Sequence, residues 1–165
     1  MQYNAYIRRA IHFTENELDA GDLIMIAKNN YTWLPDDSPA GFLANGDFAE
    51  VTKIITLEEM HGFRFARVML RLPDYDESAS FEAMLVLESL HAPHPALSPE
   101  DSKRLYQAVR EDYADLQGKE LKEAMRQDPY LNALQVKFAY ALTCHKAQGG
   151  AVGGRICGPG LHDRR

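Results

Sequence analysis

The sequence has few cysteines, no long apolar run and no excess of positive charge. Its two cysteines, Cys144 and Cys157, are too few for a disulfide framework and fit a reducing compartment. No run of about 18 apolar residues and no signal peptide is recognisable, so we expect a cytoplasmic protein without membrane contact. The net charge of −6 argues against a generic electrostatic nucleic-acid binder, because neutralising phosphates requires clustered Lys and Arg. Any nucleic-acid contact must therefore be local.

The first ninety residues contain short strand-like segments separated by tight turns. Residues 23–27 form an apolar run of strand length. Residues 48–55 are β-rich and follow the turn signal Asn45-Gly46-Asp47, and residues 63–72 alternate in the manner of a hairpin partner. Residues 82–90 fit a strand or a helix, and we take them as a strand. Four or five short strands joined by tight turns predict a small barrel.

The middle of the chain predicts helices. Ser98-Pro99-Glu100-Asp101 combines a capping residue, proline at the first helical position and acids in the first turn, so a helix should begin there and run toward Gly118. Residues 119–127 predict a second short helix that ends at Asp128-Pro129. These helices form a connector between the barrel and the next strand.

The stretch at residues 136–150 has the most pronounced pattern in the chain. Val136, Phe138, Tyr140 and Leu142 alternate with less apolar residues, which predicts a mostly buried strand. The strand ends in a polar cluster at residues 143–148, followed by two glycines that allow a tight turn or a close approach to a ligand. Open α/β sheets place ligand-binding groups at such carboxyl ends. We therefore expect the functional centre at this corner.

Ordered motifs in the chain resemble those of one enzyme family. Thr143-Cys144-His145-Lys146-Ala147-Gln148-Gly149 is similar to the T-x-H-K-x-Q-G sequence, motif V, of superfamily 1 DNA helicases of the RecD-like and UvrD-like group. Upstream, Gly21-Asp22-Leu23-Ile24-Met25, then Lys28-Asn29-Asn30-Tyr31 and Asn45-Gly46-Asp47 resemble the pattern that precedes motif V in those proteins. The resemblance covers residues 20–150.

The resemblance implies an α+β fold: a small SH3-like β-barrel, a helical connector and a C-terminal strand from a severed motor domain. The expected segments are a lead-in at residues 1–20, the barrel at 21–92, the connector at 93–135, the motif V strand and loop at 136–150 and a tail at 151–165. Because the chain has no G-x-x-x-x-G-K-[ST] loop, this part alone should bind no ATP or Mg²⁺ and catalyse nothing. The complete helicase would use both in DNA repair or recombination.

The resemblance also assigns roles to individual residues. Thr143, His145 and Lys146 would contact the backbone of single-stranded DNA. On the barrel, Arg64 and the even-numbered positions from Phe65 to Arg71 would form a further DNA-facing surface. Gln148, Gly149 and Gly150 would couple the strand end to the nucleotide site. Further candidate basic sites are Arg8-Arg9, Lys28, Lys53, Arg67, Arg71 and Lys137. The expected partners are single-stranded DNA, the remainder of the motor and, through the free edge of the severed strand, a second copy.

Several simpler interpretations compete with these assignments. Arg67 and Arg71 fit a solvated strand face better than a DNA track. Tyr31 and Trp33 fit base stacking, yet aromatic residues more often anchor a loop to a core. His91-x-x-His94 has no further ligand at metal-site spacing, and Cys144 beside His145 fits a buried filler better than a nucleophile. For the whole chain, the alternative function is a non-catalytic SH3-like protein-interaction module, which the acidic net charge favours.

The tail at residues 151–165 departs from the family pattern. It has no strand or helix period, whereas relatives continue into a second buried strand. Codons can be chosen for it so that the next reading frame encodes a peptide similar to that continuation. A frameshifted tail and an unrelated glycine-rich terminus both stay open, and both predict poor order.

Overall fold

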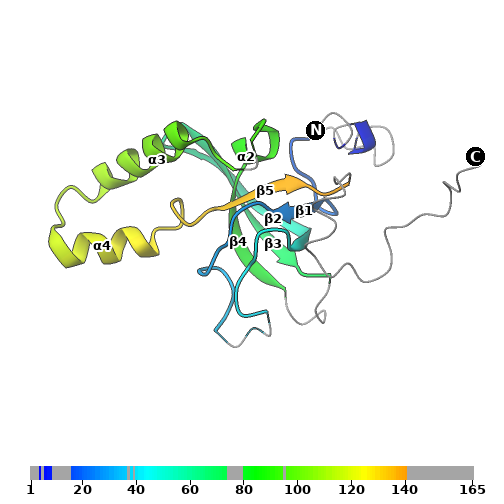
Figure 1. Cartoon of the computed structure of the whole chain (residues 1–165), viewed down its shortest axis with the longest axis horizontal. Helices are drawn as coiled ribbons and strands as arrows, with labels where there is room; N and C mark the ends of the chain where they lie inside the picture. The colour runs from blue at the N-terminus through cyan, green and yellow to red at the C-terminus, as the bar shows by residue number, and fades with distance from the viewer. Residues whose placement is uncertain are drawn as a thin grey trace, which may run out of the picture.

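The computed structural model describes residues 4, 6–8, 16–36, 38, 40–73, 80–94 and 96–140. Figure 1 shows a β-barrel from which two helices extend on one side. The described elements are β1 (Leu23–Ile26), β2 (Phe48–Met60), β3 (Phe63–Arg71), β4 (Phe81–Val86), α2 (Glu88–His91), α3 (Pro99–Asp112), α4 (Gly118–Gln127) and β5 (Leu134–Phe138). The predicted small barrel is therefore confirmed, helices lie in the segment where the sequence predicts them, and the fold is α+β.

The barrel closes in the order β1-β2-β3-β4-β5. Neighbouring strands are antiparallel, except that β4 and β5 are parallel, with Leu85 opposite Leu134. Closure is made by β1 and β5, whose register sets Ile24 opposite Phe138. A closed barrel of this size, with apolar side chains filling its interior, is consistent with the small SH3-like barrel expected from the sequence.

The strand that we expected to come from a motor domain is the fifth strand of this barrel. It pairs with β1 on one edge and, at Leu134 and Gln135, with β4 on the other. Beyond the β4 pairing, Ser89 Oγ accepts a hydrogen bond from the backbone N–H of Val136 at 2.9 Å. Both edges of β5 are thus occupied, and the barrel extends past the predicted residues 21–92. This strand does not offer the free edge through which we expected a second copy to pair.

Two apolar clusters hold the fold together. The first fills the barrel, and β3 contributes Ala66, Val68 and Leu70 to it. The second lies outside the barrel wall, where Phe63 and Phe65 of the same strand meet Val109 of α3. Alternation along one strand therefore supplies both clusters, because successive side chains point to opposite faces.

Local signals explain where α3 begins. Ser98 Oγ accepts a hydrogen bond from the backbone N–H of Asp101 at 3.0 Å, and Pro99 occupies the first helical turn. The predicted start is confirmed. The helix ends at Asp112, earlier than the predicted run toward Gly118. In the described residues no helix is long and apolar enough to cross a membrane.

The segment at residues 82–90 is only partly the strand that we predicted. Strand β4 ends at Val86, and α2 begins at Glu88. The strand ends there because of a tertiary contact. The Glu88 carboxylate accepts hydrogen bonds from the backbone N–H of Arg64 at 3.1 and 3.2 Å. Ser89 Oγ lies 2.7 Å from the carbonyl oxygen of Val86 and so closes the turn.

Candidate functional site

Most of the predicted contact residues follow the last described residue, Tyr140. Thr143, His145, Lys146, Gln148, Gly149 and Gly150 lie outside the described residues. The structure therefore describes only the strand that leads to these residues, β5, and the remaining predicted contact, Arg64.

The end of β5 is held by hydrogen bonds to β1 and to the N-terminal segment. Tyr140 Oη donates to Asp22 Oδ1 at 2.7 Å and accepts from the backbone N–H of Leu23 at 3.3 Å. The backbone N–H of Ala139 donates to the Leu23 carbonyl at 2.9 Å. Asn4 Nδ2 donates to the carbonyl of Phe138 at 2.9 Å. The backbone is thus fixed up to three residues before Thr143.

Asp22 is the buried centre of this anchor. Its carboxylate, 1% exposed, accepts from Arg8 Nε at 2.9 Å and from Arg8 Nη2 at 2.8 Å. Arg8 Nη2 also contacts Asp19 Oδ2 at 3.0 Å, and its guanidinium carbon lies 4.8 Å from the centre of the Phe138 ring. Arg8, a candidate basic site in the sequence, is therefore a buried structural cation and not an exposed phosphate ligand.

The acidic surroundings change the titration of Tyr140. Burial, together with the hydrogen bond to Asp22 and the charge of that carboxylate, raises the pKa of Tyr140 to about 12. The phenol is therefore protonated at neutral pH and remains the donor in the bond to Asp22.

Arg64, the predicted barrel contact, is neutralised by two carboxylates. Its Nη1 lies 2.5 Å from Glu17 Oε2, and its Nε lies 3.1 Å from Glu88 Oε1. Burial alone would lower the pKa of Arg64, but the hydrogen bonds and charges of Glu88 and Glu17 raise it. The side chain is 47% exposed, so a phosphate can approach it only in competition with these acids.

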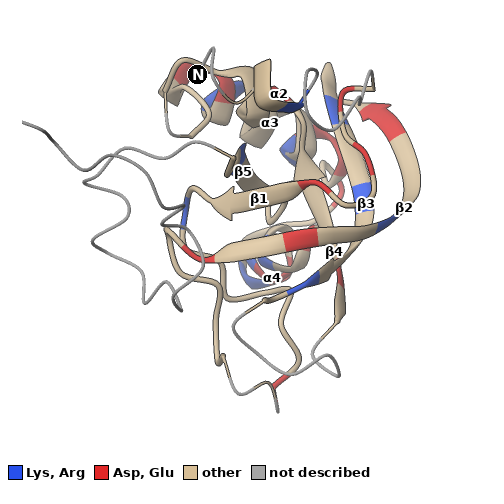
Figure 2. Ribbon diagram, turned by 90° about the vertical axis from the view of Figure 1, so that its right-hand side faces the viewer, with Lys and Arg blue, Asp and Glu red and all other residues tan. Residues whose placement is uncertain are grey.

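The rest of the predicted DNA-facing surface of the barrel is not accessible to DNA. We expected the even-numbered positions of β3 around Phe65 to share the DNA face with Arg64, but Ala66, Val68 and Leu70 are fully buried in the barrel. The odd-numbered arginines form cross-strand pairs: Arg67 with Glu82 at 3.0 Å and Arg71 with Glu50 at 2.5 Å. Figure 2 shows acidic and basic residues interspersed along the strands. These ion pairs agree with the simpler interpretation, in which Arg67 and Arg71 belong to a solvated strand face.

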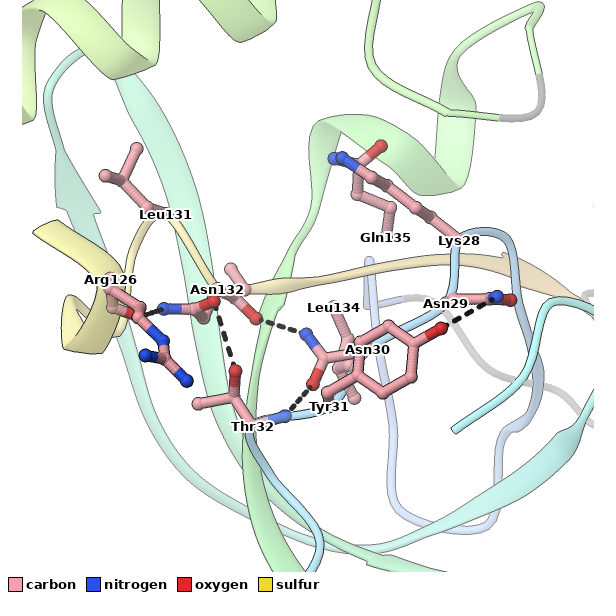
Figure 3. Close-up of a pocket in the computed structure, with 11 residues that line it drawn as sticks. Lys28, Asn29, Asn30, Tyr31, Thr32, Arg126, Leu131, Asn132, Leu134 and Gln135 are labelled. Atoms are coloured by element: carbon pink, nitrogen blue, oxygen red, sulfur yellow. Dashed lines mark hydrogen bonds between the residues drawn. The ribbon is translucent and has the colours of Figure 1, made fainter. Parts of the chain in front are cut away.

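A polar pocket of about 510 Å³ opens at the other end of β5. It lies between the loop after β1 and the connection from α4 into β5. Figure 3 shows Lys28 and Gln135 on one side, Arg126 on the other, and Asn30, Thr32 and Asn132 between them. The remaining lining residues are Asn29, Tyr31, Leu131, Ala133 and Leu134. None of the lining residues is acidic.

Asparagine side chains fix the shape of this pocket. Asn30 Nδ2 donates to the carbonyl of Asn132 at 2.9 Å, while Asn30 Oδ1 accepts from the backbone N–H of Thr32 at 2.9 Å. Asn132 Nδ2 donates to the carbonyls of Arg126 and Asp128, both at 2.8 Å. The loop after β1 and the connection before β5 are therefore joined directly, although they lie about a hundred residues apart in sequence.

The loop aromatics have different environments. Trp33 packs against both apolar clusters, and its Nε1 donates to the Asn132 carbonyl at 2.7 Å, so it anchors the loop. Tyr31 is 72% exposed and stacks on Phe42, with ring centroids 4.9 Å apart. Of the two aromatic residues considered for base stacking, only Tyr31 has the accessible ring that stacking needs.

Two further sequence candidates have structural roles. Lys137 is buried, and its Nζ donates to the carbonyls of Ser89 and Ala92, so it joins β5 to α2 and does not face solvent. His91 Nε2 lies 3.2 Å from Glu17 Oε1. Across the described part of the chain, no group of three or more His, Cys, Asp or Glu residues is arranged to hold a metal ion.

Comparison of the chain with protein-family models and with curated protein sequences gave no match. An assignment of function therefore depends on the residues and their geometry.

Proposed function

We propose that the chain is a piece of an ATP-dependent superfamily 1 DNA helicase. Its role is to bind single-stranded DNA and to link that binding to the nucleotide site of the complete motor. It does not hydrolyse ATP by itself, because the phosphate loop and the magnesium ligands belong to the remainder of the protein.

The observation that best supports this proposal is the anchored end of β5. Motif residues contact a phosphate usefully only if the strand before them is held in position. Tyr140, Asp22 and Leu23 supply that support, three residues before Thr143. The strand that precedes the motif, β5, is itself paired with β1 on one edge and with β4 on the other.

The residue roles are those that the helicase resemblance implies, and the chemistry of the side chains is compatible with them. The Thr143 hydroxyl and the His145 imidazole donate to a DNA phosphate, and Lys146 adds positive charge. Such groups position a backbone without reading its sequence. Gln148, Gly149 and Gly150 then link the DNA contact to ATP and Mg²⁺ bound by the rest of the motor.

A salt series of oligonucleotide binding tests the proposal. The affinity for a labelled oligothymidine should fall as salt rises, and Lys146→Ala should lower the log–log slope by about 0.7 for a single-strand phosphate contact. His145→Ala should weaken binding as well. Lys103→Ala, at an exposed position of α3, is the matched control and should change neither quantity. Binding that does not depend on salt, or that ignores both motif variants, contradicts the proposal.

A second candidate function is a protein-interaction module, and β2 favours it. In the described part of the chain, residues 52–60 pair with β3 on one edge and with no strand on the other. Leu57 is 63% exposed and Met60 is 41% exposed on this stretch. Open strand edges accept a further strand, from a partner or a second copy. Sedimentation velocity would detect such a dimer, and Leu57→Lys should then restore the monomer.

A further inference from the structure

We propose that the pocket between the loop after β1 and the connection into β5 binds one nucleotide unit of single-stranded DNA. This inference rests on the proposed function and adds a second contact to it, formed by residues outside motif V. The contact has three parts: a cation on each side, a polar floor and an exposed aromatic ring.

The first argument is the charge of the pocket. Lys28 and Arg126 are exposed and lie on opposite sides of it (Figure 3). In the described part of the chain, neither side chain forms an ion pair, whereas Arg8, Arg64, Arg67 and Arg71 are all paired with carboxylates. Because no acidic side chain lines the pocket, an anionic ligand need not displace a carboxylate there.

The second argument is the polarity of the floor. The oxygens of the asparagine cluster are engaged with donors: Asn30 Oδ1 with the N–H of Thr32, and Asn132 Oδ1 with Thr32 Oγ1 at 3.1 Å. Gln135 Oε1 accepts from the backbone N–H of Leu97 at 2.9 Å, which leaves its amide N–H₂ to face the pocket side that Lys28 lines. The Nδ2 groups of Asn30 and Asn132 donate within the same cluster, so a ligand would be held by the Gln135 amide and the two cations. These groups suit an acceptor-rich ligand such as a phosphodiester.

The third argument is the ring of Tyr31. This ring is 72% exposed and is backed on one face by Phe42, so its orientation is supported while its surface stays accessible. Stacking of a base on an aromatic ring tolerates any sequence and is the usual partner of a basic groove in single-strand binding. A volume of about 510 Å³ lies within the range of ligand pockets, roughly 300–1,000 Å³.

The position of the pocket relates it to the motif. Leu134 and Gln135 begin β5 and line the pocket, whereas the motif follows the other end of the same strand. At about 3.3 Å per residue, β5 itself spans on the order of 15 Å. A single strand held both at the pocket and at the motif would contact residues that precede and follow this one strand of the barrel.

The test uses the full chain and a labelled oligothymidine across a salt series. Lys28→Gln and Arg126→Gln should each lower the log–log salt slope by about 0.7, and Tyr31→Ala should weaken binding by at least about fivefold. Lys103→Gln matches the charge change at an exposed position of α3, and Tyr106→Ala removes an exposed tyrosine from the same helix; both should leave binding unchanged. All five positions are exposed, and thermal melts confirm that each variant is folded.

Trp33, the single tryptophan, provides an independent readout because its Nε1 bonds the Asn132 carbonyl at the pocket. Oligothymidine should change its fluorescence, thymidine 5′-monophosphate should do so more weakly, and inorganic phosphate should have the least effect. Equal responses to phosphate and nucleotide would remove the role of Tyr31 and overturn the inference.

These experiments distinguish a failure of the pocket inference from a failure of the proposed function. If oligothymidine binds and only the motif variants weaken it, the pocket inference is wrong and the proposed function stands. If only the pocket variants weaken it, the motif assignment is wrong and the pocket stands. If the wild-type chain neither binds oligothymidine nor changes Trp33 fluorescence with it, both proposals are wrong.

Discussion

Tyr140 Oη donates a hydrogen bond to Asp22 Oδ1 over 2.7 Å, which joins the end of the last strand to the turn before the first. The two residues are more than a hundred positions apart in sequence. The same carboxylate binds Arg8, so three segments of the chain meet at one buried charge. This contact explains how the end of β5, ahead of the predicted contact residues 143–150, is kept in position.

Tyr140 should make stability depend on pH in the alkaline range. The unfolded phenol has a pKa of 10.0, whereas the folded pKa is about 12. Below pH 10 both states carry the proton, and the contribution to stability is complete. Between these values the folded state holds the proton and the unfolded state loses it, so the free energy of unfolding falls as pH rises. Urea unfolding over this range should show a shallower fall for Tyr140→Phe. The same slope in both proteins would contradict the assignment.

Removing Asp22 should be far more damaging than removing a surface charge. Asp22→Ala leaves the Arg8 guanidinium buried without its main partner, which costs about 3–5 kcal/mol. Asp22→Asn keeps the shape and should cost less. The double variant Arg8→Ala, Asp22→Ala should lose less than the sum of the two single variants, because the uncompensated charge is gone. Chemical denaturation measures all four free energies, and simple additivity would show that the pair is not coupled.

The carboxylates around Arg64 should oppose DNA binding. Glu17→Gln removes one of the two charges that neutralise this guanidinium, and exposed pairs of this kind are worth about 0.2–1 kcal/mol. If DNA reaches the barrel at Arg64, oligothymidine affinity should rise about 1.5- to 5-fold in Glu17→Gln. Adding Arg64→Gln should cancel that gain. A gain that persists in the double variant would mean that Glu17 acts through general repulsion and that Arg64 is not a contact.

The cap of α3 should have a measurable effect. Ser98→Ala removes the acceptor of the Asp101 N–H bond and should cost about 1 kcal/mol of stability. Ser102→Ala, one turn further on and exposed, is the matched control and should be neutral or slightly stabilising, because alanine favours helices. Equal thermal midpoints for the two variants would contradict this role.

Local patterns predicted much of the fold. The apolar run at residues 23–27, the alternation in β3 and the cap at Ser98 each act over a few residues, and each has the structure expected. The break after Val86 could not be predicted, because it depends on Glu88 meeting the backbone of Arg64. Likewise, nothing local to residues 134–138 says that β5 pairs with β1, since that contact joins opposite ends of the described chain.

In the candidate site, too, single residues could be predicted from the sequence, whereas their contacts could not. Lys28 and Tyr31 were noted in the sequence as a basic site and a stacking candidate, but nothing linked them to Arg126 or Asn132. Their meeting follows from the antiparallel pairing of Ile26 with Val136, which is a tertiary event. Arg64 was selected for its charge, and its acidic partners Glu17 and Glu88 are distant in sequence.

The closing pair of strands also constrains how the chain can fold during its synthesis. Ile24 leaves the ribosome more than a hundred residues before its partner Phe138. Until then β1 and β4 each have an open side, and the barrel can form only as an incomplete sheet. Contacts so far apart in sequence slow folding, and exposed strand sides invite wrong pairing. The newly made chain should therefore be most exposed to wrong strand pairing during that interval.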